Sequence, residues 1–226
     1  MRFGRLTSAA IGAVALLIAL LLVADLGRLQ GLDRVITDTL HGFALDHPWW
    51  VRLMTWWSIV FHPTTWRIAA AVLVAWLLYR GDRLLAWWAA ATMIAGGVLG
   101  VLLKLLFGRH RPDLLDPVAR AAGYSFPSGH ALTNTLGAAV FLTVLLPYAG
   151  DRPRASRLLW AGAIAIPLVT GLSRVALGVH WTSDVVAGWL LGVAIAAGMR
   201  AAFLAYAHRA TLRSPAPKAS PGEEAR

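Results

Sequence analysis

Six long apolar stretches, separated by short segments rich in charge, glycine and proline, run along the 226 residues of the chain. They cover residues 7–26, 64–79, 84–107, 128–146, 158–176 and 183–206, and the second has an alternative start at Trp56. A helix of about 20 such residues crosses the roughly 30 Å hydrocarbon core of a bilayer. The pattern therefore predicts an all-α fold, a polytopic bundle of six transmembrane helices. In the third stretch, Gly96 and Gly100 stand four apart, which predicts close helix packing.

The first stretch follows Arg2 and Arg5 and so resembles the start of a secretory signal peptide. It is longer than the apolar region of such peptides, which has about 7–15 residues. In addition, Ala24 is followed by Asp25 rather than by a small-residue cleavage site. We therefore predict a retained membrane span.

A more polar segment, residues 27–50, comes next and has two helical faces. The apolar face comprises Leu32, Val35, Ile36, Leu40 and Phe43, and the polar face comprises Asp33, Arg34, Thr37, Asp38 and His41. This pattern predicts an amphipathic helix in the membrane interface, although the same helix packed on the other spans fits equally well. Four tryptophans at positions 49, 50, 56 and 57 then indicate an aromatic belt near one membrane face.

The composition agrees with a membrane protein, since 58% of the residues are hydrophobic and only 14% are charged. The surface of a soluble domain usually needs about 25–35% charged positions. The net charge of +10 is typical of loop arginines that set orientation, and 11 tryptophans favour a lipid partner over nucleic acid. The absence of cysteine excludes disulfides and thiolate metal sites.

Loop arginines predict how the chain is oriented in a plasma or inner membrane. Positive charge gathers in the tail and in three earlier segments, at Arg2, Arg5, Arg80, Arg83, Arg152, Arg154 and Arg157. These segments and both termini are expected in the cytoplasm, so the loops after the first, third and fifth spans lie outside. We expect one membrane domain over residues 1–210 and a disordered cytoplasmic tail over residues 211–226.

Three short segments carry polar residues that a membrane protein usually avoids. Residues 104–112 read KLLFGRHRP, residues 127–130 read PSGH, and residues 173–184 read SRVALGVHWTSD. Each alone has a simpler explanation: a snorkelling lysine, an ordinary helix N-cap or an exposed His–Asp pair. The predicted topology brings all three to the outer face, where cations and the amides of a helix start together form a phosphate site.

The third segment contains a candidate nucleophile. His180 and Asp184 share one helix face if the last helix begins near His180. The carboxylate then accepts a hydrogen bond from one imidazole nitrogen, which fixes the tautomer and leaves the other nitrogen as nucleophile or base. No metal-ligand pattern competes for these residues, so neither a metal nor another cofactor is expected.

Together the three segments resemble the signature of the type-2 phosphatidic acid phosphatase superfamily, which also includes vanadium haloperoxidases and bacterial acid phosphatases. The family pattern is Lys, six residues, Arg-Pro; then Pro-Ser-Gly-His; then Ser-Arg, five residues, His, three residues, Asp. This sequence matches every fixed position. The six-span layout extends the likeness to most of the chain.

The resemblance implies a role for each residue of the signature. His180 attacks phosphorus and forms a phosphohistidine, and Asp184 orients His180. His130 protonates the leaving oxygen and then activates water. The phosphate is held by Lys104, Arg111, Ser128, Gly129 and Arg174.

The implied function is an integral membrane hydrolase of a lipid phosphate or pyrophosphate, with its site on the extracytoplasmic side and a membrane lipid as substrate. Resemblance to small bacterial relatives favours undecaprenyl pyrophosphate. Phosphatidylglycerophosphate and phosphatidic acid remain alternatives. A vanadate-dependent haloperoxidase and a non-catalytic lipid-binding protein are more remote ones.

Several residues beside the signature also bear on the site. Trp181 and the helix at residues 32–43 are hypothesised to line a lateral lipid entrance, while interfacial anchoring is the simpler interpretation of Trp181. Arg109 and Arg120 are interpreted as solvated loop charges rather than as attractors of an anionic head group. His110 and Asp113 are assigned no role.

Overall fold

A computed structural model describes residues 2–213, and in this range the chain forms α-helices and no strand. The elements are α1 (Arg2–Ala24), α2 (Leu26–Asp46), α3 (Pro48–Val60), α4 (Pro63–Tyr79), α5 (Arg83–Phe107), α6 (Gly129–Ala149), α7 (Pro153–Ala176) and α8 (Thr182–Arg213). Helix α8 continues three residues past the predicted domain boundary at residue 210. The rest of the predicted tail, residues 214–226, lies outside the described residues.

Six helical segments are long and apolar enough to cross a membrane, which confirms the predicted number of spans. They are Gly4–Val23, Pro48–Tyr79, Arg83–Phe107, Gly129–Ala149, Pro153–Ala176 and Thr182–Arg209. The second combines α3 and α4, so it starts earlier than either expected position. It is interrupted where Pro63 begins α4, and the His62 ring accepts a hydrogen bond from the Thr64 amide at 3.2 Å.

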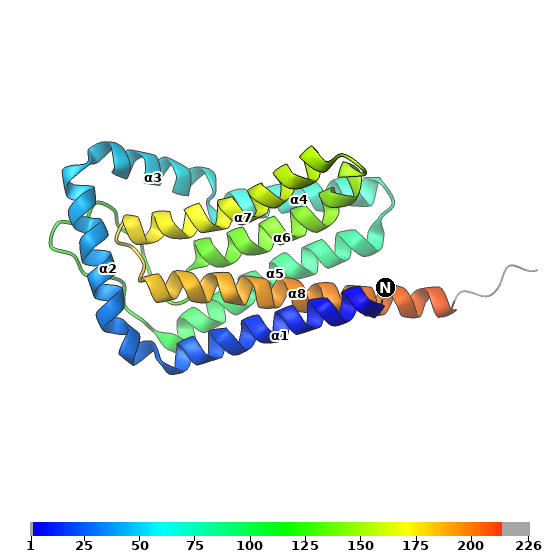
Figure 1. Ribbon diagram of the computed structural model, residues 1–226, viewed down its shortest axis with the longest axis horizontal. Coiled ribbons are helices and arrows are strands. Elements are labelled where there is room, and N and C mark those ends of the chain that lie inside the picture. The colour runs from blue at the N-terminus through cyan, green and yellow to red at the C-terminus, as the bar shows by residue number, and fades with distance from the viewer. Residues whose placement is uncertain (1, 214–226) are drawn as a thin grey trace, which may run out of the picture.

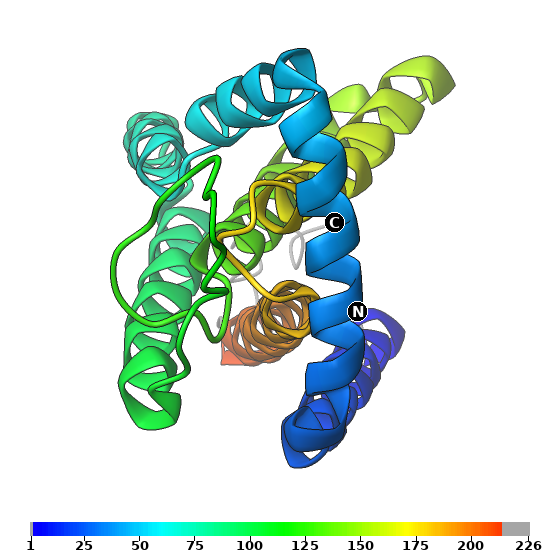
Figure 2. The same cartoon turned by 90° about the vertical axis from the view of Figure 1, so that its left-hand side faces the viewer.

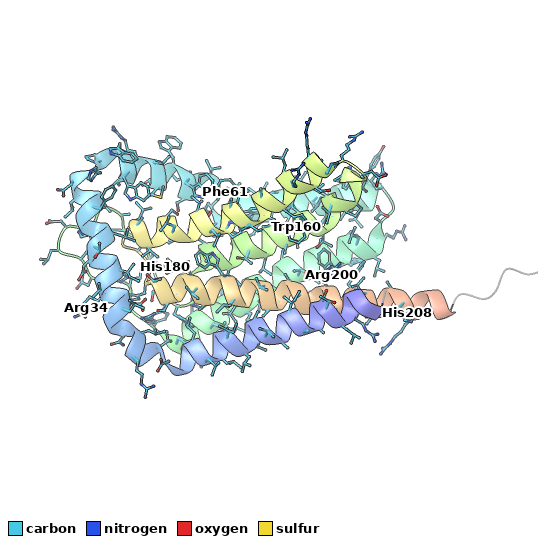
Figure 3. All side chains as sticks on the ribbon, in the orientation of Figure 1. Arg34, Phe61, Trp160, His180, Arg200 and His208 are labelled. Atoms are coloured by element: carbon cyan, nitrogen blue, oxygen red, sulfur yellow. The ribbon has the colours of Figure 1, made fainter. Side chains whose placement is uncertain are left out.

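The spans run along the long axis of the molecule, and α2 lies across one end of them (Figure 1). Figure 2 looks at that end and shows the loop of residues 108–128 on one side, α2 on the other and the junction of α7 and α8 between them. His180 is at this end, whereas Trp160, Arg200 and His208 lie toward the other (Figure 3). The segments that carry the signature therefore meet at one end of the bundle, as predicted.

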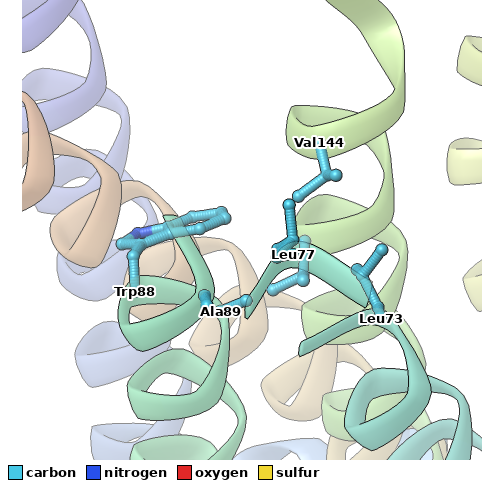
Figure 4. Packing of buried hydrophobic residues seen from close by; sticks show 7 residues of the cluster. Leu73, Leu77, Trp88, Ala89 and Val144 are labelled. Atoms are coloured by element: carbon cyan, nitrogen blue, oxygen red, sulfur yellow. The ribbon is translucent and has the colours of Figure 1, made fainter. Parts of the chain in front are cut away.

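Close helix packing in the middle of the bundle depends on small residues. A Cβ atom at Gly96 of α5 would lie 2.0 Å from Leu136 Cδ1 on α6, and one at Gly100 would lie 2.9 Å from Leu132 Cδ2. The predicted role of these two glycines is confirmed. Nearby, a cluster of buried side chains from α4, α5 and α6 fills the bundle (Figure 4), among them Leu73, Leu77, Trp88, Ala89 and Val144.

Helix α1 packs along α8 in the bundle. Ala19 of α1 belongs to a buried cluster with Leu191 and Ala196 of α8, and Arg200 donates a hydrogen bond to the Ser8 hydroxyl at 2.6 Å. The first apolar stretch is thus an integral part of the helix bundle.

Helix α2 is present where an amphipathic helix was predicted, but two residues of its polar face, Asp33 and Thr37, point into the protein. Asp33 is 3% exposed and Thr37 is fully buried, whereas Leu32 is 57% and Val35 64% exposed. The helix packs on the other spans through Ile36 and Leu40, which contact a buried cluster, and through the buried Asp33 and Thr37, while Leu32 and Val35 stay exposed. This orientation brings a carboxylate from α2 to the end of the bundle where His180 lies.

The tryptophans after α2 also differ in exposure. Trp49 and Trp56 are exposed, as an aromatic belt requires. Trp57 is half-buried, and its indole nitrogen donates a hydrogen bond to Thr170 of α7 at 2.9 Å. Helix α3 is thereby attached to α7, close to Arg174.

Candidate active site

His180 lies in the short junction between α7 and α8 and is buried. Its Nδ1 atom is 3.3 Å from Asp184 Oδ2, the contact that the spacing predicted, because α8 begins two residues after His180. The same carboxylate oxygen accepts a hydrogen bond from the Trp181 amide at 2.9 Å. Asp184 stands in the first turn of α8, where the helix dipole stabilises a negative charge.

The environment of His180 indicates its tautomer and charge. Its Nε2 atom is 3.1 Å from Arg111 Nη1, and a guanidinium can only donate, so Nε2 is the unprotonated nitrogen. The proton is then on Nδ1, which donates to Asp184. Burial, helped by the charges of Arg111 and Arg174 and opposed by Asp184, lowers the pKa of His180 to about 4. At neutral pH the residue is an uncharged imidazole with a lone pair on Nε2.

Arg111 and Lys104 are tied to the loop that connects α5 with α6. Arg111 donates to the carbonyl oxygens of Val179 at 2.6 Å and Gly123 at 2.9 Å, and burial lowers its pKa from the ordinary value. Lys104, in the last turn of α5, donates to the Tyr124 carbonyl at 2.6 Å. The two cations therefore approach His180 from the loop and from the end of α5.

Ser128 occupies the N-cap position of α6, but its side chain does not cap the helix. The residue is fully buried, and its hydroxyl has no hydrogen-bond partner among the described residues. A buried hydroxyl without a partner costs about 1–3 kcal/mol, so such a group in a native structure calls for an explanation. The interpretation of Ser128 as an ordinary cap is wrong. A hydroxyl next to the free amides at the start of α6 suits an anion instead.

His130 and Arg174 meet through a residue outside the signature, Ser58 of α3. The Arg174 guanidinium donates to the Ser58 hydroxyl, which lies 3.4 Å from His130 Nε2. The His62 ring stands at right angles to the His130 ring, with 5.1 Å between centroids. Sequence reasoning missed Ser58 and His62, because residues 49–57 suggested an interfacial belt. The available signal was a serine inside an apolar run, one helical turn after Met54, the other buried residue of α3.

The predicted site residues thus form two groups at the same end of the bundle. One contains His180, Asp184 and Arg111, with Ser128 attached through a hydrogen bond from its amide to the Asp184 carbonyl at 2.9 Å. The other contains Arg174 and His130. The groups act on one another electrostatically, since Arg174 interacts with Arg111 and His180 with His130. Lys104 reaches the start of α6, its Cε atom lying 3.9 Å from the Cβ position of Gly129.

The structure corrects the interpretation of Arg109 as a solvated loop charge. It is only 15% exposed, and it forms ion pairs with Asp33 at 2.8 Å and Asp184 at 2.6 Å. A solvated loop charge would be exposed and unpaired, as Arg120 is exposed. Trp181 stacks its ring beside the Arg109 guanidinium, 5.7 Å from the ring centroid, and donates to the His110 carbonyl at 3.0 Å.

The charge of the site suits an anion. In the described part of the chain, neither Arg111 nor Arg174 has a carboxylate within ion-pair distance, and Arg174 Nε has no hydrogen-bond partner. Buried cations without counter-ions are costly, and a phosphate group would compensate them. No group of three or more histidine, aspartate or glutamate side chains able to hold a metal ion occurs within residues 2–213.

Comparison with known proteins relates this geometry to a family. Residues 85–207 match the sequence model of the PAP2 superfamily. The chain is 33% identical over 123 residues to an undecaprenyl-diphosphatase from Sulfolobus acidocaldarius. The aligned region covers 51% of this chain and 54% of that protein. It is 36% identical over 99 residues to phosphatidylglycerophosphatase B from Bacillus subtilis, with 42% and 47% covered. The chain spans about half the length of these curated relatives.

The fold has a relative of known structure, described as the first transmembrane PAP2 type phosphatidylglycerolphosphate phosphatase from Bacillus subtilis. The TM-score is 0.74 at 22% sequence identity, and the match covers 91% of this chain and 98% of that one. The six-span bundle with a crosswise helix is therefore a fold that this relative shares. Because the family match also extends over more than half of the sequence and includes all three signature segments, the chain belongs to the PAP2 superfamily.

Proposed function

We propose that this protein is an integral membrane phosphatase that hydrolyses a lipid phosphate or pyrophosphate through a phosphohistidine at His180. The observation that carries the proposal is the geometry of His180, whose Nδ1 lies against Asp184 while Nε2 faces the Arg111 guanidinium. Such a nitrogen is a nucleophile directed at the place where the nearby cations would bind a phosphoryl group.

In the first step, His180 Nε2 attacks phosphorus, and the bond from phosphorus to the leaving oxygen of the lipid breaks. His130 donates a proton to that oxygen. Substrate binding transfers the Arg111 guanidinium from Nε2 to the phosphoryl oxygens. The phosphorylated imidazole keeps its proton on Nδ1 and is cationic, so the Asp184 carboxylate stabilises it.

In the second step, His130 accepts a proton from water, and the water oxygen attacks the phosphohistidine. The bond between phosphorus and Nε2 breaks, which releases inorganic phosphate and returns His180 to its neutral form. Charge on the phosphoryl oxygens in both steps is stabilised by the cations and by the start of α6, through Lys104, Arg111, Arg174, the Ser128 hydroxyl and the Gly129 amide.

The proposed first substrate is undecaprenyl pyrophosphate, and it is supported by the printed activity of the Sulfolobus relative. Phosphatidylglycerophosphate is the alternative, supported by the Bacillus relative. Because the signature residues are assigned to the phosphate alone, they do not distinguish between these lipids. We further propose that the site faces the extracytoplasmic side, that both termini are cytoplasmic, and that residues 1–210 form the catalytic domain.

The experiment is phosphate release by the purified protein in detergent, from a panel of lipid phosphates and pyrophosphates in the presence of EDTA. His180→Ala is expected to abolish release while the variant still elutes as folded protein. His110→Ala is a matched control, because His110 is exposed and adjoins the site without a proposed role. Release that survives in His180→Ala, or that stops with EDTA, contradicts the mechanism.

A further inference from the structure

Asp33, on the crosswise helix α2, has no place in the mechanism above, yet it is one of the most completely bonded carboxylates of the described chain. It is buried, and its Oδ1 atom accepts a hydrogen bond from the Ser183 amide at 2.9 Å. Its Oδ2 atom accepts from the Ser183 hydroxyl at 2.5 Å and pairs with Arg109 Nη2 at 2.8 Å. Asp33 thereby attaches α2 to the first turn of α8, which carries Asp184.

Arg109 joins Asp33 to the site. Its Nη1 atom donates to Asp184 Oδ1 at 2.6 Å and to the Ser183 hydroxyl at 2.7 Å, while Nη2 binds Asp33. One guanidinium thus bridges two buried carboxylates. Asp184 uses its other oxygen, Oδ2, for His180. The result is a continuous row of four side chains with alternating charge: Asp33, Arg109, Asp184 and the imidazole that becomes cationic.

We propose that Asp33 is a positioning residue for the phosphatase reaction, acting on the His180 nucleophile through Arg109 and Asp184. The inference rests on the proposed function. It adds to that function a residue from a helix outside the signature and outside residues 85–207, the range of the family match.

The physical reason lies in the charge balance of the row. Arg109 alone beside Asp184 would cancel the negative charge that stabilises the phosphorylated, cationic imidazole. Asp33 compensates Arg109, so that Asp33, Arg109 and Asp184 together carry one net negative charge. The guanidinium then fixes the orientation of Asp184 without neutralising it. One unit charge at roughly 10 Å, in an effective dielectric constant of about 20, changes the balance between neutral and cationic imidazole by about tenfold.

Other charged groups also face His180 from the elements around it. Arg111 approaches from the loop and Arg174 from α7, and both disfavour the cation, whereas Asp184 on α8 favours it. His130 on α6 interacts with His180, and Lys104 on α5 interacts with Arg111 and Asp184. Replacing Asp33 or Arg109 removes none of these charges, so differences in the pH profile between variants report the charge of the row.

The test compares Asp33→Asn with Asp38→Asn, an exposed carboxylate on the same helix. With one substrate throughout, we expect kcat of Asp33→Asn to fall about tenfold and KM to stay within about twofold. Asp38→Asn is expected to match the unmodified protein in both. Removing the negative charge of Asp33 also disfavours the cationic form of His180. The acid limb of the pH profile of kcat must therefore move to lower pH.

Arg109→Gln is expected to move the acid limb to higher pH by about one unit, because it removes the opposite charge. The double variant Asp33→Asn/Arg109→Gln retains the net charge of the row, so its acid limb should return toward that of the unmodified protein. A purely structural role of Asp33 would not produce opposite shifts and their cancellation.

Three results overturn the proposal: equal kinetics in Asp33→Asn and Asp38→Asn, shifts of the same sign in Asp33→Asn and Arg109→Gln, or a double variant whose acid limb stays raised. If Asp33→Asn alone does not fold, the acid limbs of Arg109→Gln and of the double variant are compared. Equal acid limbs in these two variants overturn the proposal. An unmodified protein without activity on any lipid phosphate refutes the proposed function itself. Normal activity that depends on His180 but not on Asp33 refutes only this inference.

Discussion

Single residues at this site differ in how their buried charge is balanced. Arg109 pairs with two carboxylates, so its charge is compensated within the protein. Arg111 instead meets carbonyl oxygens and an imidazole, and Arg174 meets a hydroxyl. Neighbouring arginines of the same loop therefore have opposite uses, since Arg109 supports the structure of the site and Arg111 remains available to an anion. Sequence pattern alone does not separate them, because both stand in the same short polar segment.

The pH dependence of the first chemical step is a prediction at this scale. Burial holds the pKa of His180 at about 4, below the roughly 6.5 of an unfolded chain. Phosphohistidine formation in a single turnover should therefore persist at about pH 5 and decline near pH 4, measured by quench-flow with labelled substrate. Loss of the step near pH 6.5, the value of a solvated histidine, would contradict the assignment.

The same shift has a consequence for stability. Between about pH 6.5 and 4 the unfolded chain binds a proton at His180 that the folded chain does not. The contribution of this residue to stability is therefore complete above pH 6.5 and is lost as the pH falls toward 4. His180→Ala should accordingly show a smaller loss of thermal stability across this interval than the unmodified protein.

At the scale of helices, what the sequence could predict follows from length and spacing. Apolar length predicted six spans, and the distance of four residues between His180 and Asp184 predicted their contact. Both depend only on local geometry. The direction of α2 was not predictable in this way, because an amphipathic pattern shows that a helix has two faces but not which one meets protein. Near a membrane, Leu32 can face lipid while Asp33 faces a polar site.

Ser58 and Arg109 were missed for a related reason. Ser58 becomes part of the site only because α3 packs on α7, and Arg109 is buried in ion pairs because its loop meets both α2 and the start of α8. These are contacts between elements far apart in the sequence. A serine in an apolar run and an arginine in a loop have common alternative explanations, and only the three-dimensional arrangement decides between them.

Helix packing gives a prediction of its own at Gly96. Its Cβ position lies 2.0 Å from Leu136 Cδ1, and Leu136 is 1% exposed, so its side chain has no free space to enter. Gly96→Ala is expected to destabilise the protein by about 1–3 kcal/mol, seen as a lower midpoint of thermal unfolding in detergent. Gly97→Ala is the matched control, because a Cβ at Gly97 meets nothing within 4 Å. Equal midpoints for the two variants would show that α5 and α6 do not pack this closely.

The whole molecule has two chemically different ends. One carries α2 and the loop of residues 108–128 (Figure 1) together with His180 (Figure 3), and the other carries the start of α1, the C-terminal part of α8 and the connections after α4 and α6. Arg80 and Arg152 belong to those connections, and Arg83, Arg154 and Arg157 lie beside them at the starts of α5 and α7. All five side chains are exposed, as charges that set orientation should be. At the site end, Arg109, Arg111 and Arg174 are engaged within the site, whereas Arg28, Arg34, Arg52 and Arg120 are exposed. The proposed extracytoplasmic position of His180 therefore depends on the exposed arginines of the opposite end.

Cysteine labelling tests this orientation, and the chain suits it because it has no cysteine of its own. Asp116→Cys introduces a thiol in the exposed loop at the site end, and Asp151→Cys introduces one in the exposed connection between α6 and α7. A membrane-impermeant maleimide added to intact cells should label the first variant, while the second should react only after permeabilisation. The reverse pattern would place the phosphate site in the cytoplasm. In that case the exposed arginines would lie outside, and lipid phosphates of the outer leaflet would be excluded as substrates.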